Sequence, residues 1–157
     1  MKTAAVLTIS DSSFQGMRQD LSGPAVAHQL TLAGFEVKHA AVLPDELEQI
    51  KQELLASCAL VRLVVTVGGT GIAERDVTPE ATLAVVEKVI GGIPERMRAE
   101  GAHKTPLAAL SRGVCGTRGK SLILNLPGSP KAAIESLQAV IKIVPHALDL
   151  LEGKTNH

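Results

Sequence analysis

Residues 60–80 read LVRLVVTVGGTGIAERDVTPE. The first eight residues form a short apolar run rich in β-branched side chains, which is typical of a strand buried on both faces of a parallel sheet. Glycines end this run, and the order Thr78-Pro79 is typical of a helix start, with the Thr78 hydroxyl as N-cap. The segment therefore predicts one strand–loop–helix unit of an α/β fold.

The same unit recurs along the chain. Apolar runs at 4–9 and 121–126 predict two more buried strands, and the alternating run at 36–42 predicts a strand nearer an edge. Helical periodicity predicts helices between the strands, at 24–33, 45–56, 79–90 and 130–151. Residues 91–120 are less regular; within them a helix at 95–103 and a loop or short hairpin at 107–119 are expected. Strands that alternate with helices indicate a three-layer α/β sandwich, with a mostly parallel central sheet and helices on both faces. No linker divides the chain, so we expect a single domain over 1–157.

Composition excludes several classes of function. The 157 residues hold 16 basic and 16 acidic side chains and only two aromatic residues, Phe14 and Phe35. This balance lacks the basic patch and the stacking platforms of nucleic-acid-binding proteins. No apolar run approaches the roughly 18 residues of a membrane span, and Cys58 and Cys115 have no ligand or CxxC spacing. We therefore expect a cytoplasmic protein with free thiols and no nucleic-acid or membrane partner.

The loops that follow the strands are expected to converge. Small polar segments precede Pro24, Pro79 and Pro130, and Ser129 stands where an N-cap hydroxyl belongs. In an open parallel sheet such loops lie at the carboxyl ends of the strands, where ligands bind near the switch point in strand order. The pattern predicts one site at this edge.

The glycine loop Gly68-Gly69-Thr70-Gly71 is the strongest candidate for ligand binding. Clustered glycines allow a close backbone approach and present successive N–H groups to an anion, and a helix N-terminus follows. The loop is neither a GK[ST] P-loop nor a GxGxxG fingerprint. Phosphate binding is favoured over a plain tight turn.

Two aspartates have open roles on residue chemistry alone. Asp76 fits a turn bond to the backbone as well as it fits holding Mg²⁺ on a polyphosphate. Asp45 is favoured as the N-cap of the next helix, with Glu48 as capping-box partner. Hydroxyls, glycines and cations at 111–120, and the loop at 126–131, suit a phosphate or polar heterocycle as well as a solvated surface. The residues therefore indicate an α/β domain for a phosphorylated small molecule.

Seven motifs then give a specific resemblance over nearly the whole chain. They are TISDS at 8–12, SGP at 22–24, PDE at 44–46, GGTG at 68–71, RDVTPEA at 75–81, LSR at 110–112 and LPGSPK at 126–131. In this order they resemble the molybdenum cofactor biosynthesis family. The resemblance is greatest to the MogA-type molybdopterin adenylyltransferases, which are related to the N-terminal domain of gephyrin.

This resemblance implies transfer of AMP from ATP to the terminal phosphate of molybdopterin, with release of pyrophosphate and a requirement for Mg²⁺. It implies catalytic and metal-binding roles for Asp45 and Asp76. The implied nucleotide contacts are Ser10, Asp11, Gly68, Gly69, Thr70, Gly71, Thr78, Pro79 and Glu80. The implied molybdopterin contacts are Ser111, Arg112, Gly128, Ser129 and Lys131.

The resemblance also implies a homotrimer that passes its product to a separate molybdenum insertase. A MoaB-like protein that binds molybdopterin without adenylyltransferase activity, as a binding or scaffold module, is the alternative. Because Pro44-Asp45-Glu46 and the run at 75–81 are intact, we place the chain on the active side.

Overall fold

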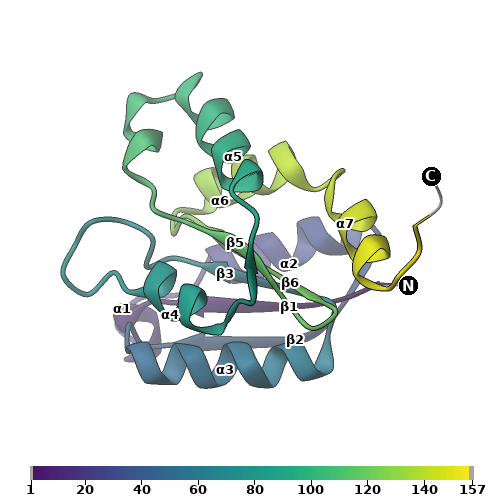
Figure 1. The fold of residues 1–157 in the computed structure, drawn as a ribbon. Coiled ribbons are helices and arrows are strands. Elements are labelled where there is room, and N and C mark those ends of the chain that lie inside the picture. Colours follow the sequence, from purple (N-terminus) through teal and green to yellow (C-terminus); the bar gives the residue numbers. More distant parts are fainter. Residues whose placement is uncertain (1, 156–157) are drawn as a thin grey trace.

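The computed structural model describes residues 2–155, which form a six-stranded sheet in the order β2-β1-β3-β6-β5-β4 (Figure 1). The strands are β1 (Lys2–Ile9), β2 (Phe35–Leu43), β3 (Leu63–Val67), β4 (Lys88–Val89), β5 (Cys115–Arg118) and β6 (Ser121–Leu126). The pairs β2–β1, β1–β3 and β3–β6 are parallel, whereas β5 is antiparallel to both of its neighbours. The mostly parallel sheet and the edge position of β2 confirm the prediction.

Helices cover both faces of the sheet, which confirms the three layers. They are α1 (Asp11–Phe14), α2 (Ser22–Leu32), α3 (Leu47–Leu60), α4 (Thr78–Val85), α5 (Gly92–Ala102), the 3₁₀ helix η1 (Pro106–Leu110), α6 (Pro130–Val140) and α7 (Val144–Leu151). One apolar core joins the sheet to α2, α5, α6 and α7, and a second joins it to α3 and α4. Figure 1 shows α3 on one side of the sheet and α6 and α7 on the other.

Alternation along the strands explains the two cores. Val65 and Leu124 belong to one core, whereas their neighbours Val64 and Ile123 belong to the other. All residues of β3 and β6 are buried, as expected for central strands with helices on both faces. Cys115 is buried and Cys58 half-buried, both as free thiols, and burial raises the pKa of Cys115 to about 12.

Several boundaries differ from the prediction. The apolar run at 60–67 is shared, because α3 continues to Leu60 and the strand begins only at Leu63. The helix expected at 79–90 ends at Val85, and β4 follows it. The helix expected at 130–151 is two helices, since Pro145 lacks the N–H to continue α6 and fits the first turn of α7.

The region expected as a loop or short hairpin contains η1 and then β5, which forms a hairpin with β6 through Gly119. Within residues 2–155, no helix has the length and apolar content needed to cross a membrane.

Candidate functional site

The loops after β1, β3 and β6 meet at the switch point of the sheet. Strand β2 lies on one side of β1 and β3 on the other. The connections that leave β1 and β3 therefore run in opposite directions along the sheet. Gly68 has a φ of +102°, and a Cβ on it would collide with the carbonyl oxygen of Ile9 and lie 3.9 Å from the Cα of Gly128. Only glycine permits this approach, and the predicted convergence is confirmed.

Each carbonyl of the glycine loop, residues 68–71, accepts a hydrogen bond from either Thr78 or Arg112. Thr78 donates from Oγ1 to the Gly68 oxygen at 3.0 Å and from its amide to the Gly69 oxygen at 3.2 Å. Arg112 donates from its amide to the Thr70 oxygen at 2.8 Å and from Nε to the Gly71 oxygen at 2.7 Å.

The amides of the same loop are arranged differently. Among residues 2–155, none accepts a hydrogen bond from the amide of Gly69, Thr70 or Gly71. With every carbonyl tied to Thr78 or Arg112, the loop has the amide-rich character of an anion-binding nest. This arrangement supports the phosphate-binding interpretation of the sequence.

Asp76 lies against Gly71 of the glycine loop. Its Oδ2 accepts a hydrogen bond from the Ala73 amide at 3.0 Å, which is the turn bond considered from sequence. The same oxygen lies 2.8 Å from where a Cβ of Gly71 would stand, so the carboxylate is against the glycine loop. Three residues, Asp76, Thr78 and Arg112, are called the Asp76 side below, together with the buried network of Thr66, Thr82 and Asn125 that supports them.

A buried hydrogen-bond network supports the Asp76 side. Asn125 Nδ2 donates to Thr66 Oγ1 at 2.9 Å and to Thr82 Oγ1 at 3.0 Å, and Asn125 Oδ1 accepts from the Val114 amide at 3.1 Å. Thr82 Oγ1 donates in turn to the carbonyl oxygen of Thr78. Asn125, Thr66, Thr78 and Thr82 are all buried, so the network joins β3 and β6 to the start of α4.

Near Gly69 of the same loop, Asp45 and Asp11 bind each other's backbone. The Asp45 amide donates to Asp11 Oδ1 and the Asp11 amide donates to Asp45 Oδ2, both at 2.9 Å. Asp45 Oδ1 lies 3.1 Å from the position of a Gly69 Cβ. Arg75 donates to both oxygens of Asp11 and to Glu46. These four residues, Asp11, Asp45, Glu46 and Arg75, are called the Asp45 side.

The two expected caps next to these aspartates are wrong, while the third is confirmed. Helix α3 begins at Leu47 with Glu46 as N-cap and no side-chain cap, because Asp45 is bonded to Asp11. Thr78 lies inside α4 and uses its hydroxyl on the glycine loop. Ser129 caps α6 by accepting from the Ala132 amide at 3.2 Å.

Asp11 and Asp45 have opposite pKa shifts. Hydrogen bonds from the Arg75 side chain and the Asp45 amide lower the pKa of Asp11. Burial raises the pKa of Asp45, and the nearby charges of Asp11 and Asp76 add to that rise. The Asp45 carboxylate therefore lies where a bound cation would relieve repulsion.

The two carboxylates at the glycine loop fit Mg²⁺ chemistry. Among residues 2–155, no cluster of three or more His, Cys, Asp and Glu could hold a metal ion. Mg²⁺ is usually held by one or two carboxylates together with substrate phosphates and waters. Asp45 lies close to Gly69 and Asp76 close to Gly71, so the site has two carboxylates beside an amide-rich loop that offers a place for the phosphate.

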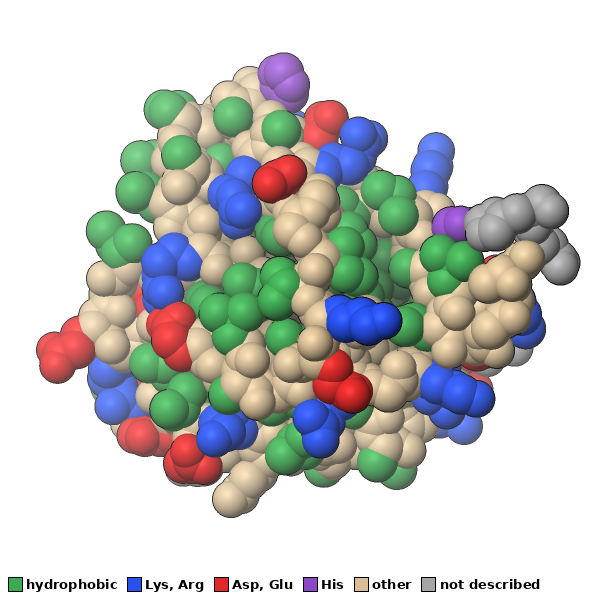
Figure 2. Space-filling model, viewed as in Figure 1, with side chains coloured by type: hydrophobic (Ala, Val, Ile, Leu, Met, Phe, Trp, Pro, Cys, Tyr) green, Lys and Arg blue, Asp and Glu red, His purple; other side chains and the backbone are tan. Residues whose placement is uncertain are grey.

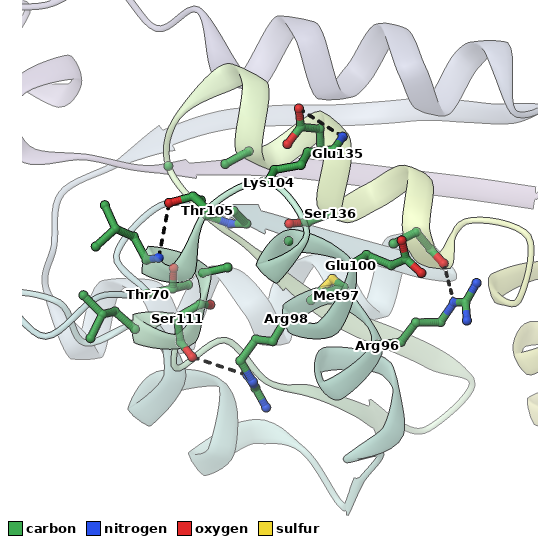
Figure 3. Close-up of a pocket in the computed structure, with 18 of the residues that line it drawn as sticks. Thr70, Arg96, Met97, Arg98, Glu100, Lys104, Thr105, Ser111, Glu135 and Ser136 are labelled. Carbon is green, nitrogen blue, oxygen red and sulfur yellow. Dashed lines mark hydrogen bonds and ion pairs between the residues drawn. The ribbon is translucent and has the colours of Figure 1, made fainter.

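A cleft of about 1070 Å³ runs from the glycine loop along α5, η1 and α6. Six predicted site residues line it: Gly69, Thr70, Gly71, Asp76, Ser111 and Gly128. Figure 3 shows Thr70 and Ser111 toward one end and Arg96 at the other. Its size is at the upper end of small-molecule sites, about 300–1,000 Å³.

Other predicted residues support the site without lining the cleft. Ser10 caps α1 and Asp11 holds Asp45 and Arg75. Thr78 and Pro79 are buried behind the glycine loop. Glu80 pairs with Arg112 at 2.8 Å, whereas Ser129 and Lys131 are exposed at the start of α6.

Three cations that line the cleft, Arg96, Arg98 and Lys104, were missed from sequence. Lys104, just beyond α5, pairs with Glu135 on α6 at 3.2 Å, and Arg98 donates to the carbonyls of Ser111 and Gly113 (Figure 3). The group of cations at 96, 98 and 104 could have indicated an anion-binding wall, but the hydrophobic pattern of residues 91–120 is too irregular to place these side chains. Figure 2 shows positive and negative side chains interspersed around apolar ones on this face, with no broad patch of one sign.

Comparisons with known proteins agree with this geometry. Residues 5–146 match the family described as "Probable molybdopterin binding domain". The chain is 43% identical over 153 residues to the molybdopterin adenylyltransferase of Helicobacter pylori J99, covering 94% of this chain and 86% of that protein. The corresponding values for the Escherichia coli K12 enzyme are 42% over 168 residues, with 94% and 84% covered.

Solved structures give the same result. The molybdopterin biosynthesis enzyme MoaB of Thermus thermophilus superposes with a TM-score of 0.92 at 48% identity, covering 98% of each chain. Motifs, fold and relatives thus agree over almost the full length. The chain belongs to the "Probable molybdopterin binding domain" family of molybdenum cofactor biosynthesis.

Proposed function

We propose that this protein is a molybdopterin adenylyltransferase, which transfers AMP from ATP to the terminal phosphate of molybdopterin and releases pyrophosphate. The observation that carries the proposal is the pair Asp45 and Asp76, which lie close to Gly69 and Gly71 of a glycine loop whose amides at 69–71 have no acceptor within residues 2–155. Relatives named molybdopterin adenylyltransferase that match 94% of the chain support the same activity.

The chemistry needs no activated serine or cysteine. An oxygen of the molybdopterin phosphate attacks the α-phosphorus of ATP, and the bond from that phosphorus to the bridging oxygen of pyrophosphate breaks. Such transfers depend mostly on positioning and on neutralising charge. The 69–71 amides would bind phosphate oxygens of the nucleotide, and Asp45 and Asp76 would hold Mg²⁺, which neutralises the polyphosphate charge. Both aspartates act here as ligands and not as general bases.

The cleft provides a place for the pterin substrate. Ser111 and Gly128 lie where the cleft meets the glycine loop, and Lys104 and Arg98 extend along it. A polar heterocycle with a phosphate fits a pocket that combines apolar walls with a few cations and hydroxyls. We assign Ser111 and Gly128 to the phosphate end; Ser129 and Lys131, at the start of α6, would contact the substrate only from the rim.

The test is turnover by purified protein with Mg-ATP and freshly prepared molybdopterin, with adenylylated pterin followed by chromatography. Wild type is expected to form product, and Asp45→Asn and Asp76→Asn to lose about a hundredfold or more, equivalent to about 2.7 kcal/mol of barrier. Asp149→Asn is the matched control, because Asp149 pairs with Lys2 at the start of β1, the opposite end of the strand from Asp11. Equal activity in all three variants would reject the assignment of the two aspartates.

A second candidate is a MoaB-like protein that binds molybdopterin without transferring AMP. The structure with 48% identity bears the name MoaB but is described as a molybdopterin biosynthesis enzyme, so the name by itself does not separate the two candidates. Folded wild type that binds molybdopterin but yields no adenylylated product would establish this candidate. Retention of both Asp45 and Asp76 is the sequence feature that supports the enzyme.

We further propose that residues 1–157 act as one domain in a cytoplasmic homotrimer that passes its product to a molybdenum insertase. Sedimentation at micromolar concentration tests the assembly, and a monomer there would reject the trimer.

A further inference from the structure

We infer that Arg112 is a positioning residue, which fixes the glycine loop and Asp76 and does not itself contact the substrate phosphate. This inference rests on the proposed function and replaces the expectation from sequence that Arg112 binds the pterin. Arg112 lies in the segment between η1 and β5, and its Nε donates to the Gly71 oxygen of the glycine loop.

All three guanidinium nitrogens of Arg112 are bonded within the protein. Nε donates to the Gly71 oxygen at 2.7 Å, and Nη2 donates to the carbonyl oxygen of Asp76 at 2.8 Å. Nη1 donates to both carboxylate oxygens of Glu80, at 3.0 and 2.8 Å. A guanidinium used in this way has a fixed orientation and few donors left for a phosphate.

The partners of Arg112 define what it positions. Its amide and Nε together bind the Thr70 and Gly71 oxygens, and its Nη2 binds the backbone of Asp76. Arg112 therefore turns these carbonyls away from the ligand side and holds the peptide that carries the Asp76 carboxylate. Arg112 does not line the cleft, whereas its neighbour Ser111 does.

The segment that carries Arg112 is itself held from behind. Arg98 on α5 donates to the Gly113 oxygen at 3.1 Å and to the Ser111 oxygen at 3.4 Å. Backbone on both sides of Arg112 is thus tied to α5, which forms a wall of the cleft. The backbone that carries the Arg112 guanidinium is therefore itself held in place while the guanidinium binds the glycine loop.

Arg112→Lys distinguishes positioning from contact. Lysine keeps the positive charge that a phosphate contact needs, but one ammonium cannot reproduce a planar fork that binds three separate groups. Hydrogen exchange of the peptide covering 68–80, followed by mass spectrometry, reports on the loop without requiring activity. The protected amides there include those of Ala73, Asp76 and Thr78.

For positioning, we expect exchange of this peptide to be about tenfold faster in Arg112→Lys and Arg112→Gln. We also expect kcat to fall about thirtyfold in both variants, with KM for molybdopterin within about threefold of wild type. Methylguanidinium added to Arg112→Ala should restore part of the activity. Arg118→Gln is the control, since Arg118, at the end of β5, donates to the Val85 oxygen at the end of α4, and both readouts should stay at wild-type values.

Unchanged exchange in Arg112→Lys and Arg112→Gln would overturn the inference whether or not the protein turns over. A lysine variant with wild-type kcat, beside a glutamine variant with raised KM, would assign Arg112 to the substrate instead. If wild type makes no product but the exchange changes occur, the proposed activity fails while the positioning role stands.

Discussion

The two sides of the glycine loop carry the same kinds of residue but support them differently. Each side has an aspartate against the loop and an arginine nearby. On the Asp45 side, Arg75 is 55% exposed and binds carboxylates that are themselves 30% and 51% exposed, those of Asp11 and Glu46. On the Asp76 side, Arg112 binds two backbone carbonyls as well as the carboxylate of Glu80, and the threonines and asparagine of the network are buried.

Because of this difference, we expect one side to control the conformation of the glycine loop and the other to control the charge beside it. Exposed ion pairs are screened by salt and contribute little to folding, whereas breaking a buried hydrogen-bond network leaves unpaired polar groups. The shape of the glycine loop should therefore depend on the Asp76 side. The Asp45 side should instead set the electrostatics at the loop, since its ion pairs hold the pKa of Asp11 low while the pKa of Asp45 is raised.

The largest expected effect is that of Asn125→Ala, which removes the centre of the buried network. Thr66 Oγ1, Thr82 Oγ1 and the Val114 amide each lose a partner. We expect the free energy of unfolding, measured by urea denaturation, to fall by about 3 kcal/mol.

Thr31→Ala is the control for Asn125→Ala. Thr31 donates to the Ala27 oxygen on an exposed helix surface, so its loss should cost less than about 0.5 kcal/mol. If the two variants were equally stable, the Asp76 side would not be the better supported one.

A smaller effect is expected for Gly69→Ala, which touches both sides of the loop. Gly69 has a φ of +69°, and its Cβ would lie 3.1 Å from Asp45 Oδ1 and collide with Thr78 Oγ1. Gly34→Ala is matched for backbone strain, because Gly34 has a φ of +91° with nothing within 4 Å of its Cβ. Strain alone costs about 1–2 kcal/mol, and we expect Gly69→Ala to exceed Gly34→Ala by about 1 kcal/mol in urea unfolding. Equal losses would show that the loop has room at Gly69.

The sequence predicted the frame of this site better than its supports. Buried apolar runs and Pro-initiated helices indicated a parallel sheet, and this was sufficient to place the loops at one edge. Helix ends were less predictable, because Leu60 continues the apolar run while belonging to α3, and β4 has only two residues. A hydrophobic pattern over a few residues does not show where pairing with a strand distant in the sequence begins, so it cannot fix the end of a helix or strand.

Side-chain roles were hardest to predict where the partner is distant in sequence. Asp45 has the position of an N-cap, yet it is bonded to Asp11, 34 residues away. Thr78 precedes a proline as a cap would, yet its hydroxyl reaches back to Gly68. Ser129, whose partner is three residues away, was predicted correctly. Local chemistry thus identified local bonds, and the family motifs were needed to single out Asp45.

Asp45→Asn tests the electrostatic role of its side and should change stability modestly. A pKa raised in the folded state means that the protonated form favours folding, and this contribution is lost as the pH rises through the raised value. Asparagine removes the half-buried charge of Asp45, so at about pH 7 we expect the Tm to rise by about 1–3 °C. The gain should vanish as the pH falls below 3.8, the ordinary pKa.

Asp149→Asn provides a control of opposite sign for the pH series. The Lys2 side chain lowers the pKa of Asp149, so the ionised form favours folding and its contribution is lost as the pH falls. The Tm of this variant should lie below wild type at neutral pH and converge with it in acid. A Tm for Asp45→Asn below wild type at neutral pH would contradict the charge-tuning role.

The smallest expected effect, and the most specific, is that of Arg75→Gln on its neighbours. Arg75 is the first cause of the lowered pKa of Asp11, and its charge also lowers that of Asp45. Its removal should therefore raise both pKa values, more strongly for Asp11, as followed by ¹³C NMR of the carboxyl groups. High salt should mimic part of the change in wild type, because the ion pair is exposed. Arg118→Gln should leave both values unchanged. If neither salt nor Arg75→Gln changed the pKa of Asp11 or Asp45, burial alone would set the charge at the glycine loop. The two sides would then differ only in how rigidly they hold the loop.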